Sequence, residues 1–201
     1  NKYKNKHTMK TNLIITDDFY NNPDETREWA LAQPFNVAGN FPGRRTKPVH
    51  GWDLEQVIQG IVKPHGGNIT SFGDEYCTAF QYTIKDDVSW IHADHTTMWA
   101  GVCYLTPDAP ADSGTGIFRH KKTGWETAQM NKDGSYNKAG LDVINADAHD
   151  YSKWDMTAMV GNVYNRLVLY RGDMFHRSLE YFGNDKNDGR LFQTFFFNTE
   201  F

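Results

Sequence analysis

The chain has 201 residues, enough for one domain with a sizeable core and short for two. Its 21 Lys and Arg against 25 Asp and Glu give a formal charge of −4, which provides no general attraction for nucleic acid or an anionic membrane. No long apolar run and no basic start leading into an apolar region occur, so we expect neither a spanning helix nor a secretory signal. We therefore predict a single cytoplasmic domain over residues 1–201.

The first elements follow from local signals. Residues 1–12 are polar and without periodicity, and we interpret them as an unstructured or artificial terminus. Residues 13–20 have the β-branched and apolar content of a strand. A helix is predicted from Pro23 to about residue 33, with Asn22 as its cap and Glu25 closing a capping box.

Residues 34–51 are rich in Gly and Pro and are predicted to form a long surface loop. The loop carries three cations, Arg44, Arg45 and Lys47. They either meet an anionic substrate or belong to an ordinary solvated loop. A second helix is predicted after Asp53 as cap, because apolar residues follow at helical spacing, and Pro64 is expected to end it.

The pattern then changes to that of a β protein, with alternating or continuously apolar segments. The predicted strands are 76–82, a segment carrying His92 and Asp94, 97–105, 117–118, 163–171 and 190–197. Cys77 and Cys103 lie in such segments and are read as small buried thiols. Residues 120–160 form a polar excursion, partly helical over 154–160.

Two helices followed by many short strands favour a mainly β fold with flanking helices, of the α+β class. We predict a double-stranded β-helix, that is, a jelly-roll-like pair of sheets with the N-terminal helices packed on one outer face.

A pair of metal-binding side chains stands out in the stretch VSWIHADHTTMWAGVCYL, residues 88–105. On a strand, His92 and Asp94 point to the same face and can reach one point in space. Together with a distant His, such a pair gives two imidazoles and one carboxylate, a set suited to non-haem Fe(II). His176 follows a later strand ending in Arg171, and is the candidate third ligand.

The ordered set of His-x-Asp, a distant His and a Gly-Arg pair resembles the Fe(II)- and 2-oxoglutarate-dependent dioxygenases, most closely their prolyl-hydroxylase-like branch. The likeness covers about residues 76–198. In that branch a strand with a Tyr precedes the His-x-Asp, as Tyr82 does here, and a Tyr-Leu pair closes the next strand, as Tyr104 and Leu105 do. A Gly-rich turn with Thr then leads to a Phe-containing strand, as in residues 114–118.

Two further stretches, NNPDETREWALAQPF and FPGRRTK, resemble an uncharacterised group of phage and marine-bacterial proteins within this superfamily. That likeness brings no substrate with it.

The resemblance implies roles for individual residues. His92, Asp94 and His176 would bind the iron, and Arg190 would hold the far carboxylate of 2-oxoglutarate. A guanidinium fork matches a carboxylate with two parallel hydrogen bonds, which supports Arg190 independently. Thr194 lies four residues on and faces the same side of a strand. The hydroxyls of Tyr82 and Tyr104 either bind the same carboxylate or belong to ordinary core residues.

The implied cofactors are Fe(II), 2-oxoglutarate and O₂, and the implied reaction is decarboxylation of 2-oxoglutarate to succinate and CO₂ with hydroxylation of a substrate. Because Asp94 is a carboxylate and leaves no iron position for halide, the resemblance favours hydroxylation, or a demethylation that begins as one, over halogenation. Arg177 competes with Arg190 but should point away from the iron, since it adjoins His176 on a strand.

Two other classes of function stay open from the sequence. A cupin-like isomerase or hydrolase would use the same triad with Zn²⁺ or Fe²⁺ and would not need Arg190. A non-catalytic jelly-roll module would bind a ligand through the aromatic residues of the excursion. For the substrate, a small molecule or a protein side chain is favoured; neither nucleic acid nor membrane is indicated.

Overall fold

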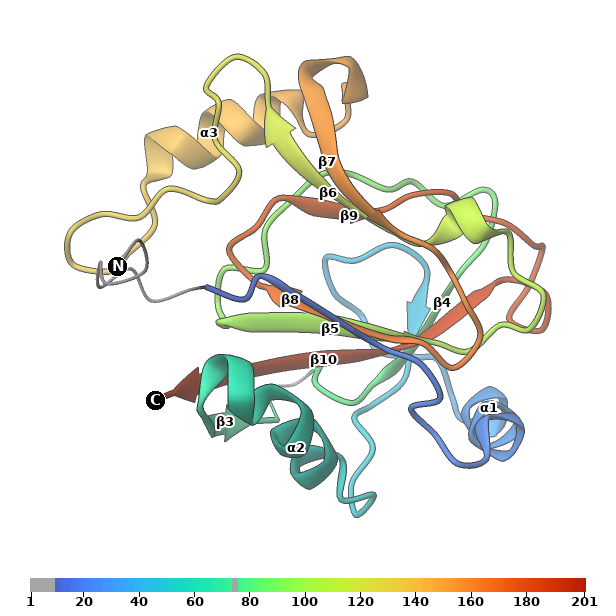
Figure 1. Ribbon diagram of the computed structural model, residues 1–201. Coiled ribbons are helices and arrows are strands. Elements are labelled where there is room, and N and C mark those ends of the chain that lie inside the picture. Colours follow the sequence, from blue (N-terminus) through green and yellow to red (C-terminus); the bar gives the residue numbers. More distant parts are fainter. Residues whose placement is uncertain (1–9, 74–75) are drawn as a thin grey trace, which may run out of the picture.

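The computed structural model describes residues 10–73 and 76–201, which form two antiparallel sheets facing each other (Figure 1). Among these residues, the large sheet has the order β1-β8-β5-β10-β4-β2, with β3 also paired to β10, and the small sheet has the order β7-β6-β9. The strands of the large sheet are β1 (Leu13–Thr16), β2 (Arg44–Arg45), β3 (Asn68–Phe72), β4 (Phe80–Thr83), β5 (Trp99–Tyr104), β8 (Leu167–Arg171) and β10 (Arg190–Glu200). Those of the small sheet are β6 (Thr115–His120), β7 (Trp154–Val160) and β9 (His176–Ser178).

The core is divided into layers by these sheets. The first layer lies between the large sheet and two helices on its outer face, α1 (Pro23–Ala32) and α2 (Leu54–Gly66), where Ile58 of α2 packs with Phe195 of β10 (Figure 1). The second lies between the two sheets and includes Val102 and Ile117. The predicted jelly-roll-like fold, with N-terminal helices on one outer face, is therefore confirmed.

A third layer lies under α3 (Lys138–Asp147), which covers the small sheet (Figure 1). This helix, inside the polar excursion, was not predicted, although Leu141, Ile144 and Ala148 follow helical spacing. Asn137 caps it, because its side chain accepts a hydrogen bond from the backbone of Gly140 at 2.9 Å. The excursion is thus an ordered cover over the small sheet.

The first two helices occur where they are predicted, but not through the expected caps. Asn22 makes no side-chain cap, and its amide instead donates to Glu25 at 3.3 Å. Asp53 has a left-handed backbone (φ 52) and also makes no side-chain cap. Pro64 lies inside α2, which continues to Gly66. Pro64 has no backbone N–H to donate to the carbonyl of Gly60, four residues earlier, and the helix ends two residues later.

Several strand boundaries differ from the prediction for local backbone reasons. The strand expected from residue 76 begins only at Phe80, because Thr78 has a left-handed backbone (φ 69). The Thr78 hydroxyl donates to the carbonyl of Val49 at 2.8 Å, which holds this backbone in place. Cys77, expected in the strand, therefore lies in the turn that precedes it. Similarly, the strand expected from residue 163 begins only at Leu167, because Asn165 has a left-handed backbone (φ 64).

Residues 154–160 form the strand β7, so the prediction of a partly helical segment was wrong. The segment WDMTAMV pairs with β6 and is an edge strand, with Met156 and Met159 half exposed at 51% and 52%. A strand with one face in solvent is expected to alternate apolar and polar residues. Here apolar residues occur on both faces, so the alternation is not visible in the sequence.

The terminal prediction for residues 1–12 falls mostly outside the described residues; of the described part, the carbonyl of Asn12 accepts a hydrogen bond from the backbone of Arg171. Over residues 10–73 and 76–201, each helix is too short or too polar to cross a membrane.

One hydrogen bond between side chains ties α3 to the small sheet. The Nε2 of His120, at the end of β6, lies 2.9 Å from Asp147 Oδ2, and the His120 side chain is fully buried. Replacing Asp147 with Ala should lower the free energy of unfolding by about 1–3 kcal/mol, because it leaves a buried imidazole nitrogen without this partner. The matched control is Asp142→Ala on the same helix, whose ion pair with Lys138 is exposed and worth about 0.5 kcal/mol or less. Urea denaturation of both variants measures the difference. Equal losses of unfolding free energy in the two variants would contradict a stabilising role for the contact between His120 and Asp147.

Candidate metal centre

Two histidines distant in sequence are brought together by a single backbone bridge. The predicted strand through His92 does not form; instead His92 and His176 pair directly, each donating its backbone N–H to the other's carbonyl, at 3.0 and 2.8 Å. Residues paired directly in this way send their side chains to the same face. The two imidazole rings accordingly lie 4.5 Å apart between centroids.

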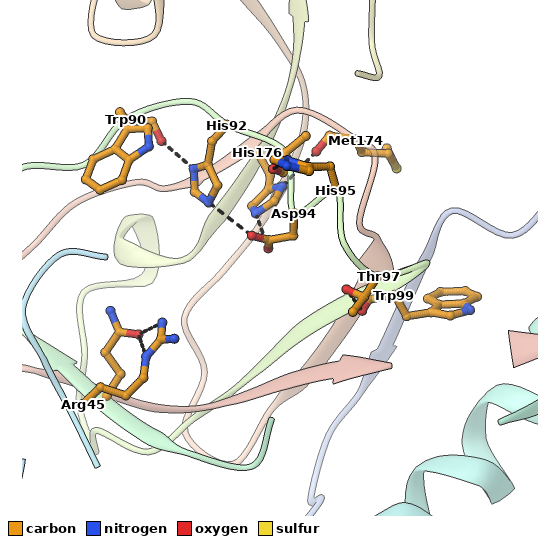
Figure 2. A network of polar contacts seen from close by, with 11 residues as sticks. Arg45, Trp90, His92, Asp94, His95, Thr97, Trp99, Met174 and His176 are labelled. Carbon is orange, nitrogen blue, oxygen red and sulfur yellow. Dashed lines mark hydrogen bonds and ion pairs between the residues drawn. The ribbon is translucent and has the colours of Figure 1, made fainter. Parts of the chain in front are cut away.

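Asp94 completes the group from two residues beyond His92. Its carboxylate lies 3.1 Å from Nε2 of His176 and 3.8 Å from Nε2 of His92. Figure 2 shows the three side chains pointing toward one another. The backbone here packs tightly on Gly172, where a Cβ atom would come within 2.5 Å of the Asp94 carbonyl oxygen. A glycine at this position therefore lets the segment approach the end of β8.

The three side chains offer their ligand atoms within 4.8 Å of one another, and among the described residues this is the group of His, Cys, Asp or Glu that could hold a metal ion. Two nitrogens and one carboxylate oxygen on one side of a cavity form the facial arrangement that suits a divalent transition metal with open positions. The ligand atoms thus meet the first requirement of a metal site.

Backbone carbonyls fix the tautomers of both imidazoles. The Nδ1 of His92 lies 3.0 Å from the carbonyl of Trp90, and the Nδ1 of His176 lies 2.8 Å from that of Met174 (Figure 2). A carbonyl can only accept, so each Nδ1 carries a proton, and in the neutral form of either ring the Nε2 keeps its lone pair. Both Nε2 atoms face Asp94, which is the orientation that a metal ligand needs.

The protonation states also suit a metal. Burial, followed by the neighbouring His176 ring, lowers the pKa of His92 below its ordinary value of 6.5, which favours the neutral ring. Burial raises the pKa of Asp94, but the two imidazoles and the Arg45 guanidinium outweigh it and bring that pKa to about 2. At neutral pH the set is therefore a neutral His92 beside an ionised carboxylate, the forms in which these groups bind metal.

The triad lies in a cavity of about 560 Å³ between the two sheets. Its walls come from the inner faces of both sheets, from α3 and from the loop before β2. The wall residues include Asn40, Phe41, Arg45, Tyr76, Gln81, Trp90, Val102, Thr115, Leu141, Ile144, Asn145, Tyr170, Phe175, Tyr181, Phe192, Thr194 and Phe196. A second cavity of about 510 Å³, lined by residues 48–56 and the end of β3, contains none of the triad.

Arg190 begins β10, on the same face of the strand as Phe192, which lines the cavity. The residue is fully buried, and its Cζ lies 4.5 Å from the Phe192 ring centroid. Nε donates to the carbonyl of Ser113 at 2.8 Å and Nη2 to that of Gly114 at 3.3 Å. Nη1 is also buried and has no hydrogen-bond partner in the described part of the chain. This guanidinium therefore keeps one buried donor for a further acceptor.

Two of the other predicted residues lie near Arg190 or the cavity. The ring centroid of Tyr104 is 5.3 Å from the Arg190 Cζ, and its hydroxyl lies 2.6 Å from Thr115 Oγ1, which itself lines the cavity. Thr194 lines the cavity, but its hydroxyl donates to the backbone carbonyls of Tyr76 and Ala79.

The structure does not bring Tyr82 to the site. On β4 the alternation of side chains turns Gln81 into the cavity and Tyr82 to the opposite face, where its ring packs against Phe35 at 5.0 Å. Of the two alternatives for Tyr82, the structure therefore favours an ordinary core residue. Arg177 points away from the triad, as predicted, and stacks on Tyr151 with its Cζ 3.9 Å from the ring centroid.

Two parts of the site are defined only by the structure. The sequence leaves open whether the loop cations, Arg45 among them, meet an anionic substrate or solvent, and the structure buries Arg45 in the cavity wall beside Gln81. The excursion contributes a roof formed by α3, with Leu141, Ile144 and Asn145, where no helix is predicted. Helical spacing of the apolar residues on α3 was the signal that could have identified the roof.

Comparisons of the sequence with known proteins identify a family but no curated relative. The sequence profile of a family described as a family of unknown function (DUF6445) matches residues 2–197. A comparison with curated protein sequences finds no match.

Among solved structures, HygX from Streptomyces hygroscopicus with nickel and 2-oxoglutarate bound superposes with a TM-score of 0.63 at 11% identity, over 96% of this chain and 84% of HygX. A prolyl-4-hydroxylase from Pseudomonas putida superposes with a TM-score of 0.54 at 16% identity, over 94% of both chains. At these identities the likeness establishes a shared fold.

Proposed function

The chain belongs to DUF6445, a family of unknown function, and we propose that it is an Fe(II)- and 2-oxoglutarate-dependent oxygenase that hydroxylates an organic substrate. The observation that carries the proposal is the grouping of His92, Asp94 and His176 within 4.8 Å, with both Nε2 atoms left as acceptors. The structurally similar HygX was solved with iron and with nickel and 2-oxoglutarate, which supports the same choice of metal and cosubstrate here.

The residues beyond the triad fit 2-oxoglutarate. The cosubstrate carries a second carboxylate at the far end from the chelating group, and that carboxylate needs a buried cationic partner. Arg190 offers one, since its Nη1 is buried without a partner among the described residues. The hydroxyl of Thr115 lies in the cavity wall beside Tyr104, where it can add a donor to the same carboxylate. We assign the cosubstrate subsite to Arg190, Thr115 and Tyr104.

Each residue has a definite task in this proposal. His92, His176 and Asp94 hold the metal, and the carbonyls of Trp90 and Met174 keep both imidazoles in the tautomer that binds it. Arg190 fixes the orientation of the cosubstrate, and apolar walls such as Val102 and Ile144 limit access of water. When bound, the iron and 2-oxoglutarate supply the activation of O₂ and the oxidation of a C–H bond, chemistry that side chains do not provide.

Adding 2-oxoglutarate to the Fe(II)-loaded protein without oxygen should produce a visible metal-centred absorption band. On admission of O₂ the same sample should form succinate and CO₂. The Zn(II)-loaded protein is the matched control, because zinc has no redox chemistry and should give neither signal. An iron-loaded protein that shows no band at saturating 2-oxoglutarate would favour a cupin-like isomerase or hydrolase instead.

The likeness of residues 21–35 and 41–47 to phage and marine-bacterial proteins, demethylation as an outcome, and a small molecule or protein side chain as the substrate stay predictions.

A further inference from the structure

Arg45 is a buried cation in the wall of the metal cavity. It lies on the two-residue edge strand β2, which pairs with β4 so that Arg45 is opposite Gln81 and Arg44 is opposite Tyr82. Alternation along the strand sends the two arginines to opposite sides. Arg45 is only 6% exposed and lines the cavity, whereas Arg44 is exposed outside it.

The guanidinium of Arg45 is held in a fixed position. Its Nε donates to Gln81 Oε1 at 2.9 Å, and its Nη2 donates to the same oxygen. Its Cζ lies 3.8 Å from the Phe41 ring centroid and 4.7 Å from that of Tyr76, so aromatic rings pack against the cation. A cation fixed in this way loses little further rotamer entropy when it binds an anion.

Arg45 and the metal triad face each other across the cavity. Figure 2 shows the guanidinium on the opposite wall from His92 and Asp94. The lining of the same cavity also includes the apolar residues Val102, Leu141, Ile144, Phe175 and Phe196. The cavity thus combines a cation, a set of apolar side chains and a candidate metal set.

We propose that Arg45 binds the anionic group, a carboxylate or a phosphate monoester, of a small amphipathic substrate whose apolar segment crosses the cavity toward the metal triad. The oxidation of that segment rests on the proposed oxygenase function, whereas the binding does not. Arg45 lies on the edge strand beside the loop residues Asn40 and Phe41, at the border of the cavity. Arg190 is fully buried and keeps an unpartnered donor within the described chain, so the cosubstrate is assigned to Arg190.

Binding of matched anionic and neutral compounds tests this assignment. The probes are the alkanoates from propionate to octanoate and hexyl phosphate, compared with the corresponding amides and hexanol, titrated calorimetrically into the Ni(II)-loaded protein with 2-oxoglutarate present. The best anion should bind at least about tenfold tighter than its neutral partner, as a hydrogen-bonded charge pair in a buried site implies. An absence of any preference for the anions would overturn the proposal on wild-type protein alone.

The variants then locate the effect. Arg45→Gln should lose the preference for the anion. Arg45→Lys keeps the positive charge and should keep part of the preference, which shows that a variant at this position still folds. Arg44→Gln, with the same change in net charge on the neighbouring exposed residue, should behave as wild type. If Arg45→Gln kept the preference, or if it weakened 2-oxoglutarate binding and left the alkanoates unaffected, Arg45 would not be the substrate anchor. Failure of the oxygenase proposal is a separate result, since it appears as a missing absorption band and missing succinate in wild type.

Discussion

Replacing Asp94 with Ala should weaken the binding of Fe(II) or Ni(II) by roughly a thousandfold. Binding free energies of about 10–16 kcal/mol for four-ligand structural zinc sites correspond to about 2.5–4 kcal/mol per ligand, and the upper end of that range is roughly a thousandfold. Asp94 is also the sole anionic ligand in the set of three and faces both Nε2 atoms. Calorimetric titration of the metal-free protein with Ni(II) measures the change, and circular dichroism checks that the variant is folded.

His95→Ala is the matched control, because His95 adjoins Asp94 but is not one of the three candidate ligands. Its ring is exposed and lies 4.1 Å from that of Tyr136, and it is outside the group of ligand atoms. This variant should bind the metal like wild type. If Asp94→Ala bound Ni(II) as tightly as His95→Ala does, the ligand assignment would be wrong.

Replacing Arg190 with Met should raise the concentration of 2-oxoglutarate needed for half-saturation by about a hundredfold while metal binding is retained. Truncating one partner of a buried charge pair typically costs about 2–5 kcal/mol. The Met side chain removes the Arg190 guanidinium, whose buried Nη1 has no hydrogen-bond partner among the described residues. The half-saturation point of the anaerobic absorption band measures the effect apart from catalysis.

Two further variants guard this result. Arg190→Met also loses the bonds to the carbonyls of Ser113 and Gly114, so Arg190→Lys, which keeps the charge, separates loss of fold from loss of the cosubstrate. Arg177→Met removes the competing arginine, which stacks on Tyr151 outside the cavity, and should leave the requirement unchanged. A higher requirement in Arg177→Met together with an unchanged one in Arg190→Met would reverse the assignment.

The fold could be predicted largely because its central strands are continuously buried. The residues of β5 are all buried, and those of β10 nearly so, and such strands read as uninterrupted apolar or aromatic runs. Peripheral elements were harder to predict. Thr78 breaks an alternating pattern through a left-handed backbone held by a contact with Val49, and no local signal reports a contact 29 residues away.

The grouping of His92, Asp94 and His176 could be predicted because the spacing of the first two is robust to the details of the backbone. His92 and Asp94 share a face of an extended chain whether or not a full ladder forms, and here one bridge to His176 is enough. The role of Tyr82 could not be predicted in the same way, since a shift of one residue in register exchanges the two faces of a strand. For the same reason the burial of Arg45 became evident only from its pairing with Gln81.

The carbonyls that orient the two imidazoles belong to the backbone of Trp90 and Met174. In many metal sites a carboxylate side chain performs this task, and its loss disturbs the ligand. Here every amino acid supplies the same acceptor, so the side chains at these positions can change without changing the histidine tautomers. A substitution of Trp90 can therefore reshape the cavity wall while both imidazoles keep the orientation of the candidate metal site.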